Sequence, residues 1–297
     1  MTAPAPSHPL IEIDVTADLA RELLREQHPD LADLPLHGRG TGWDNLTWRL
    51  GEDLALRFPV RELSSALVER EQRWLSVLAP RLPVAVPSPV RVGRPSDLYP
   101  WTWSVVPWLH GDCVAATPVA GRTAWAQQLA EVLAAFHAPA PADAPTNPYR
   151  GVPLADRYAV MVERLTPDLP HVAALRDALE AGLAALPWDR PAVWVHGDPH
   201  PGNLVSRDGR LTGLLDFGDL CSGDPASDLA TAWMTFDAAG REAFVARTRE
   251  LHGWDDATWL RARAWAAATV PVLLAHPHDY PLMAAAGEHT AAQIAAG

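Results

Sequence analysis

The chain has 297 residues, of which 48% are hydrophobic, so it can bury a core in one large domain or two smaller ones. Its formal net charge of −12 argues against nucleic acid and anionic membranes as partners. The charge would favour a cationic ligand, although ordinary solubility explains it equally well. All 24 basic residues are arginine, so any mechanism that requires a lysine must use another group.

The first third of the chain alternates between strand-like and helical patterns. Strand-like runs lie at 34–60, 84–93 and 99–111, and helical spacing of apolar residues occurs at 15–27 and 62–79. Thr16 is a plausible N-cap, and the turns GRGTG and GED divide the first strand-like run into three. These patterns predict a five-stranded antiparallel sheet with a helix inserted after its third strand.

The remainder is mostly helical, with helices expected at 123–137, 155–165, 171–186 and after residue 225. Between them lies VWVHGDPHPGNLV (193–205), in which His196, Asp198 and His200 alternate. On a strand these three side chains would point the same way, as in the site of a metal hydrolase. In a loop, Asp198 and Asn203 would instead be the working pair.

The stretch LVSRDGRLTGLLDFGD, which follows Asn203, carries a strong hairpin signal in Asp208-Gly209. A two-residue turn there predicts three cross-strand pairs, Arg207 with Arg210, Val205 with Thr212, and Asn203 with Leu214. Asp216 would share a face with Leu214 and therefore lie diagonally across from Asn203, at roughly 7–8 Å. Two such oxygen ligands suit a hard cation, whereas the metal-hydrolase interpretation finds no third ligand.

The motifs HGDPHPGN, LLDFGD and GDPASDLA together resemble the signature set of the aminoglycoside phosphotransferase family, small actinobacterial type, from about residue 15 to about residue 290. The resemblance implies an α+β, protein-kinase-like fold with two lobes. A small antiparallel-sheet lobe that binds nucleotide would span 1–106, and 107–111 would be the hinge. A helical lobe with the catalytic and acceptor sites would span 112–297.

The same resemblance implies roles for residues of the second lobe. Asp198 would be the catalytic base, and Asn203 and Asp216 would hold Mg²⁺; the alternative for Asp198 is a carboxylate that caps a loop turn. His196 would support the loop by packing and hydrogen bonding. Asp224, and Asp228 with less support, would cap a helix and buttress the catalytic loop.

In the first lobe, Arg57 stands where the family usually has lysine, and its guanidinium suits phosphate oxygens. Its expected partner is Glu71, with Glu69 as the second choice; the alternative is that Arg57 is a surface residue. The loop 38–42 between the first two strands would cover the phosphates. The remaining nucleotide-binding candidates are Gly40, Thr41 and Gly42 in that loop, the carbonyl of Pro107 and the N–H of Leu109.

The predicted activity is phosphoryl transfer from ATP or GTP, with Mg²⁺, to a hydroxyl of a small molecule. An aminoglycoside-like or other cationic antibiotic is the first choice of acceptor. The alternative acceptors are a macrolide and a metabolite alcohol or amine, choline- or sugar-like. The alternative function is that of a nucleotide-binding protein without transfer activity. Candidate acceptor residues are Asp219, Asp237 and Trp233, followed by Asp255, Asp256, Trp254 and Trp265.

The cysteine count and the apolar runs bear on compartment. Cys113 and Cys221 show no ligand spacing, so neither a disulfide scaffold nor a zinc site is predicted. The N-terminus, MTAPAPSHPLIEI, lacks the pattern of a secretion signal, and the apolar stretch 264–278 is too short to span a bilayer. We expect a cytoplasmic monomer or homodimer.

Overall fold

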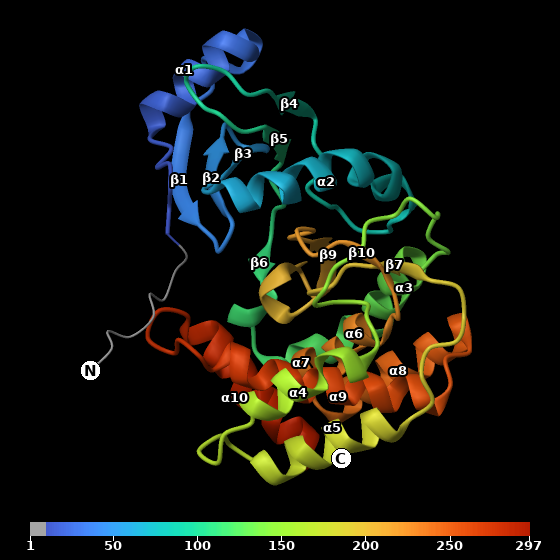
Figure 1. Cartoon of the computed structure of the whole chain (residues 1–297). Helices are drawn as coiled ribbons and strands as arrows, with labels where there is room; N and C mark the ends of the chain where they lie inside the picture. The colour runs from blue at the N-terminus through green and yellow to red at the C-terminus, as the bar shows by residue number, and fades with distance from the viewer. Residues whose placement is uncertain (1–9) are drawn as a thin grey trace. The chain divides into compact units, whose positions relative to one another are not determined.

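The computed structural model describes residues 10–297, which form two compact units (Figure 1). The first comprises 10–80 and 85–109, and the second 81–84 and 110–297. The prediction that no secretion signal is present concerns residues 1–13, and residues 1–9 lie outside those that the structure describes. Within them, no helix is both long and apolar enough to cross a membrane.

The first unit is built on a five-stranded antiparallel sheet with the order β1-β2-β3-β5-β4. Its elements are α1 (Ala17–Gln27), β1 (Leu36–Thr41), β2 (Asn45–Leu50), β3 (Leu54–Pro59), α2 (Glu62–Leu78), β4 (Arg91–Gly93) and β5 (Trp103–Pro107). The predicted five strands and inserted helix are therefore present. Thr16 caps α1 as expected, because its hydroxyl accepts a hydrogen bond from the N–H of Leu19 at 3.2 Å.

Strand β3 separates two environments because its side chains alternate between the faces of the sheet. Leu56 and Phe58 are fully buried in a core that also includes Leu23 and Leu24 of α1. Arg57, between them, points to the other face, where it meets α2. Helices α1 and α2 thus cover opposite faces of the sheet, and the Arg57 side chain lies on the face that α2 covers.

The glycine-rich segment differs from its prediction as a loop. Gly40 and Thr41 belong to β1, where they pair with Thr47 and Leu46 of β2. A bulge between His37 and Arg39 takes up the extra residue, so the strand continues through the glycines. The chain turns only at 42–44, where the Gly42 N–H donates to the Asn45 carbonyl at 2.9 Å.

The second unit is mainly helical and is packed around α9 (Asp256–Leu273), which is buried along most of its length. The other helices are α3 (Ala126–Phe136), α4 (Leu154–Arg164), α5 (Val172–Ala184), α6 (Ala226–Leu229), α7 (Thr231–Thr235), α8 (Ala238–His252) and α10 (Pro281–Ala295). Helices α5, α6 and α10 contact α9 directly. A helix that is apolar on nearly all sides requires such a surrounding layer.

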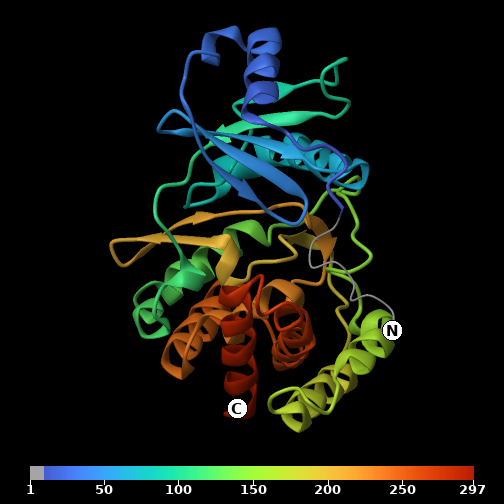
Figure 2. The ribbon, with the colours of Figure 1, turned by 90° about the vertical axis from the view of Figure 1, so that its left-hand side faces the viewer.

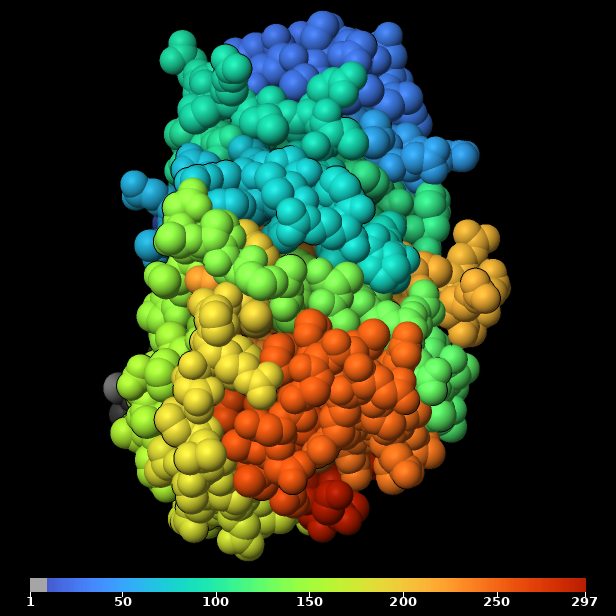
Figure 3. All heavy atoms as spheres, turned by 90° about the vertical axis from the view of Figure 1, so that its right-hand side faces the viewer, coloured from blue at the N-terminus to red at the C-terminus, as the bar shows by residue number. Residues whose placement is uncertain are grey.

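Two small sheets lie on this helical layer and carry the segments of interest (Figure 2). One pairs β7 (Val193–Val195) with β10 (Cys221–Gly223), and the other has the order β6-β8-β9. The strands of the latter are β6 (Asp112–Cys113), β8 (Leu204–Arg207) and β9 (Arg210–Leu214). The turn of the β8–β9 hairpin is exposed and projects from the surface in Figure 3.

The hairpin has the predicted turn but a different register. Arg207 pairs with Arg210, whereas a bulge next to Thr212 places Val205 opposite Gly213 rather than opposite Thr212. The predicted pair of Asn203 with Leu214 is therefore wrong by one residue, and Leu214 pairs with Leu204. An inserted residue exchanges the faces of everything beyond it, so the same-face argument for Asn203 and Asp216 does not hold.

Candidate active site

In the first unit, Arg57 and Glu71 form the ion pair that the family resemblance implies. The Arg57 Nη1 atom lies 2.7 Å from Glu71 Oε2, and the two side chains are only 12% and 6% exposed. Glu71 is on the buried stripe of α2, together with Val68 and Leu75, whereas Glu69 is exposed. The helical period therefore selects Glu71 over Glu69 as the partner.

The other nucleotide-binding candidates of this unit lie in or beside the sheet. Pro107 closes β5 opposite Leu54, and the next residue donates its N–H to the Asp53 carbonyl at 2.7 Å. Leu109 is the last residue of the unit. Gly40, Thr41 and Gly42 are exposed at the end of β1. The roles expected for these residues stay predictions.

In the second unit, the catalytic-loop motif leaves β7 through a tight turn at Gly197. This glycine has φ +93, and a Cβ atom there would come within 2.7 Å of the backbone oxygen of Asp219. A side chain is excluded on both counts, which explains the glycine between His196 and Asp198. The turn brings the loop against the segment that follows Asp216.

His196 connects the catalytic loop to the chain just before Asp216. The imidazole is fully buried; its Nδ1 accepts from the Asp198 N–H at 3.1 Å, and its Nε2 lies 3.0 Å from the Leu215 carbonyl. Because Nδ1 is an acceptor, the hydrogen-bond network assigns the proton to Nε2. The residue thus holds two chemically important segments in place, in agreement with its expected supporting position.

Asp228, rather than Asp224, buttresses the loop. Its carboxylate accepts from the N–H groups of His196 and Gly197, both at 2.8 Å, and lies 3.0 Å from His137 Nε2. The carboxylate of Asp224 instead accepts from the Ala226 N–H at 3.0 Å. It also pairs with Arg261 at 2.7 Å. Asp224 is a structural residue as expected, but its side chain holds the start of α6 against α9.

The Asp198 carboxylate has a cationic or polar neighbour at each oxygen. Arg150 Nη2 lies 3.6 Å from Oδ1, and His200 Nε2 lies 3.4 Å from Oδ2. Burial alone would raise the pKa of Asp198, but electrostatic interactions with His200 and Arg150 outweigh it and hold the pKa below its ordinary value. Asp198 is consequently ionised at neutral pH, which a proton acceptor requires.

Asn203 ends the 3₁₀ turn Pro201–Asn203, and its side chain folds back on the loop. Its Nδ2 donates to the Asp198 carbonyl at 2.9 Å, which directs the amide oxygen away from that bond. The Asn203 carbonyl accepts from the N–H of Leu215 at 2.8 Å, so the chain just before Asp216 runs beside Asn203. The structure thus brings these two chain segments together, although through a different register from the predicted one.

Asp216 has a left-handed backbone, with φ +60, which is uncommon for a residue other than glycine. Its Oδ1 accepts from the Gly218 N–H at 3.3 Å. A local hydrogen bond of this kind compensates for the strained conformation. The carboxylate and the amide oxygen of Asn203 are ligands of the kind that Mg²⁺ prefers, so the two residues fit a magnesium site in their chemistry.

Asp219 is the second carboxylate near the Arg150 guanidinium. Its Oδ1 accepts from Asn147 Nδ2 at 2.8 Å, and its Oδ2 lies 3.6 Å from Arg150 Nε. Burial raises the pKa of Asp219, and the nearby carboxylates of Asp198 and Asp216 add to the rise, against the opposing effect of Arg150. The predicted acceptor residue Asp219 is thus already engaged by an arginine and an amide.

Five of the remaining acceptor candidates lie elsewhere in the unit. Asp237 caps α8, accepting from the Gly240 N–H at 2.9 Å and the Thr123 hydroxyl at 3.1 Å. Asp255 caps α9, and Asp256 pairs with Arg249 at 2.5 Å. Trp233 lines a groove of about 580 Å³ with Trp259 and Arg241, and Trp254 stacks on His252. None of these five residues lines the cavity beside Asp198 that the described residues form.

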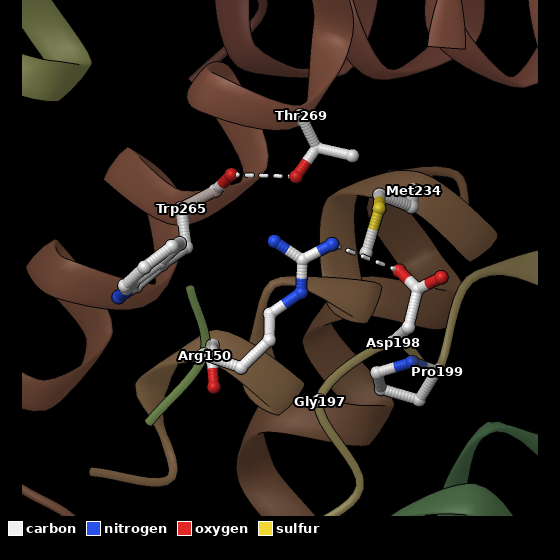
Figure 4. A pocket seen from close by; sticks show the side chains of 8 residues that line it. Arg150, Gly197, Asp198, Pro199, Met234, Trp265 and Thr269 are labelled. Atoms are coloured by element: carbon white, nitrogen blue, oxygen red, sulfur yellow. Dashed lines mark hydrogen bonds and ion pairs between the residues drawn. The ribbon is translucent and has the colours of Figure 1, made fainter. Parts of the chain in front are cut away.

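That cavity is small, about 10 Å³, which is close to the space that one water molecule needs (Figure 4). Arg150 reaches into it with Asp198 on one side and Trp265 on the other. The lining residues are Arg150, Gly197, Asp198, Pro199, Ser227, Met234, Trp265 and Thr269. Of the tryptophans expected at an acceptor pocket, Trp265 rather than Trp233 lines the same cavity as Asp198.

An antiparallel sheet with an inserted helix, followed by helices that carry an HGD loop and a DFG turn, defines a kinase-like fold. The sequence matches the phosphotransferase enzyme family (APH) over residues 35–265. The chain therefore belongs to this family. A search with this chain finds no significant match among curated protein sequences.

Solved structures of similar fold cover nearly the whole chain. A GDP and kanamycin complex of APH(2")-IIIa is 19% identical, with 94% of this chain and 99% of that chain covered and a TM-score of 0.68. The macrolide 2'-phosphotransferase MphH from Brachybacterium faecium is 24% identical, with 93% and 98% covered and a TM-score of 0.62. The streptomycin–ATP complex of APH(2")-IIa is 17% identical, with 94% and 96% covered and a TM-score of 0.57.

The family match and these structures confirm three predictions. The family is the one that the motifs indicate, the fold is α+β and kinase-like, and the enzyme class is that of a small-molecule kinase.

Proposed function

We propose that the protein transfers the γ-phosphoryl group of ATP or GTP to a hydroxyl of a small molecule, with Asp198 as the base. The observation that carries this proposal is the position of the Asp198 carboxylate beside Arg150 and His200, in a loop that His196 and Asp228 hold in place. The acceptor oxygen would attack the γ-phosphorus while its proton passes to Asp198. The bond from that phosphorus to the β–γ bridging oxygen would break, releasing the nucleoside diphosphate.

Mg²⁺ is the metal that this chemistry requires, and Asn203 and Asp216 would hold it. Both present oxygen ligands, and the Asn203 side chain is oriented by its bond to the Asp198 carbonyl. When bound, the ion would neutralise charge on the phosphates of the nucleotide. Because the Asn203 side chain is bonded to the base's own backbone, a change at this position should disturb both metal binding and the base.

The nucleotide would also engage residues of the first unit. Arg57, oriented by Glu71, would contact phosphate oxygens in place of the usual lysine. Gly40, Thr41 and Gly42 would lie over the phosphates, and the Pro107 carbonyl and Leu109 N–H would contact the base of the nucleotide. We likewise propose the division into a nucleotide lobe (1–106), a hinge (107–111) and a catalytic lobe (112–297).

Two classes of acceptor are proposed. An aminoglycoside-like antibiotic is supported by the net charge of −12 and by the kanamycin and streptomycin complexes of similar structures. A sugar-like metabolite alcohol is supported by the Arg150 side chain beside Asp198. The two acceptor classes differ in how many cationic groups the acceptor carries near its reacting hydroxyl.

The test is an acceptor panel of aminoglycosides, macrolides, sugars and amino alcohols, with ATP or GTP and Mg²⁺. Product is read by mass spectrometry as the gain of one phosphate. The wild-type protein should give product with at least one acceptor, and Asp216→Ala should lose the Mg²⁺-dependent turnover. Nucleotide binding without product from any acceptor would instead support the non-catalytic alternative.

A further inference from the structure

The segment that carries Arg150 is fastened to β10. The N–H of Asp224, just past this strand, donates to the Gly151 carbonyl at 2.9 Å, and the Ser222 N–H donates to the Pro145 carbonyl at 2.9 Å. The backbones approach so closely that a Cβ atom on Gly223 would lie 1.8 Å from the Gly151 oxygen. The Arg150 backbone is thus held at a fixed place beside the site.

The Arg150 guanidinium is near two carboxylates without being tightly bound by either. Its nitrogens lie 3.6 Å from Asp198 Oδ1 and 3.6 Å from Asp219 Oδ2, and both distances exceed those of ordinary hydrogen bonds. Among the described residues, no protein acceptor lies within hydrogen-bond distance of it. Its side chain is 27% exposed, so its N–H groups remain available to oxygen atoms of a ligand.

Arg150 is the one cation among the described residues that line the cavity. Asp198, the one acid in that lining, lies 3.6 Å from its guanidinium, and Asp219 lies at the same distance from a second nitrogen. The lining also includes Met234, Trp265 and Thr269, which carry no charge. A cationic group of an acceptor bound here would therefore lie beside the guanidinium of Arg150.

We infer that Arg150 determines acceptor specificity: it hydrogen-bonds oxygen atoms next to the reacting hydroxyl and disfavours acceptors with ammonium groups there. The acceptor class is then a neutral or acidic polyol rather than a polycationic antibiotic. An arginine presents a planar set of donors that matches neighbouring hydroxyls or a carboxylate. An ammonium group at the same place would meet a like charge. This inference rests on the proposed function, because it takes Asp198 as the base.

The test measures binding rather than turnover, so its result does not depend on the transfer chemistry. Kanamycin is titrated calorimetrically into the wild-type protein, Arg150→Gln and Arg150→Lys, each as the full chain at one ionic strength. Removing the charge leaves Asp198 and Asp219 without their common cation. The Kd of Arg150→Gln for kanamycin should therefore fall by about tenfold or more, and Arg150→Lys should behave like the wild type.

Arg207→Gln is the matched control. This arginine lies at the turn of the β8–β9 hairpin and its side chain is 63% exposed, so its removal changes the net charge equally without removing a contact of Arg150. It should leave the Kd for kanamycin within about twofold, since distant charges are screened by salt. Equal changes in Arg150→Gln and Arg207→Gln would overturn the inference. The inference would also fail if Arg150→Gln left the Kd unchanged, or if neither Arg150→Gln nor the wild type bound kanamycin detectably.

Turnover separates this result from a failure of the proposed function. Glucose, glucosamine and glucuronate share one skeleton and differ in charge, so they are offered with nucleotide and Mg²⁺ to the wild type and to Arg150→Glu. The wild type should phosphorylate glucosamine most slowly, and the variant should favour it over glucuronate by about tenfold. If the wild type phosphorylates glucosamine fastest, the inference about Arg150 fails but the proposed function stands. If the wild type phosphorylates none of these sugars and no acceptor of the panel, the proposed function fails.

Discussion

Each unit contains an arginine that faces a carboxylate, but the two pairs differ in geometry. Arg57 and Glu71 are almost fully buried and 2.7 Å apart, whereas Arg150 and Asp198 are about one-third exposed and 3.6 Å apart. The buried pair has exchanged water for a short hydrogen bond and cannot lose a partner without leaving a charge in the interior. The open pair can exchange its partner for a ligand at little cost.

The largest effect should come from removing the carboxylate of the open pair. We expect Asp198→Asn to reduce kcat by about a thousandfold, roughly 4 kcal/mol, because the acceptor hydroxyl loses its proton acceptor. Tm should hardly change, since this side chain is about one-third exposed. Asp208→Asn at the exposed hairpin turn is the control and should retain full activity; a similar loss in both would exclude Asp198 as the base.

The same change in the buried pair should act on folding. Glu71→Gln removes the negative charge that lies 2.7 Å from Arg57 in a buried place, and the free energy of unfolding should fall by about 3 kcal/mol. Urea denaturation measures this. Glu69→Gln, two residues away and exposed, should change stability by less than about 0.5 kcal/mol. If both variants unfold alike, the Arg57–Glu71 pair contributes little to the first unit.

A fully buried carboxylate that binds backbone groups sharpens the comparison further. Asp228→Asn keeps the shape but weakens the two bonds to the catalytic loop, because hydrogen bonds to a charged acceptor are stronger. We expect a loss of about 2 kcal/mol in unfolding free energy, together with a lower kcat at unchanged nucleotide Kd. Asp224→Asn, which acts on the α6–α9 contact, should lose stability without the effect on kcat.

The smallest effect concerns pH. A base works when it is deprotonated, so activity is lost as pH falls through its pKa, and a lowered pKa moves that loss to lower pH. Arg150 is one of the groups that lower the pKa of Asp198. In Arg150→Gln the acidic limb of kcat/KM should therefore move to higher pH. An unchanged limb would mean that this limb reports another group.

Local patterns in the sequence predicted the elements that depend on neighbouring residues. The Thr16 cap, the Asp208-Gly209 turn and the position of Glu71 on the buried stripe of α2 follow from spacing of a few residues. The bulge beside Thr212 could not be predicted, because a bulge leaves no mark on apolar alternation in so short a strand. The glycines of β1 likewise resemble a loop in sequence, because the bulge between His37 and Arg39 that lets the strand continue leaves no mark in the sequence pattern.

Long-range contacts account for the functional residues that the sequence did not reveal. Arg150 belongs to a segment that looks like an ordinary proline-rich loop, and it reaches Asp198 only because β10 holds that segment. The family resemblance implies that Asp224 buttresses the loop, whereas Asp228 holds it. Their actual partners, Arg261 and the catalytic loop, depend on helix packing and not on local spacing.

The close approach of Gly151 and Gly223 matters to anyone who wishes to alter the acceptor range by directed evolution. A library that randomises the loop before α4 should leave both glycines unchanged, because any side chain on Gly223 would overlap the Gly151 backbone. Position 150, by contrast, carries a partly exposed side chain beside Asp198. A library can therefore place its variation there, while Gly151 next to it limits how far the loop can be rebuilt.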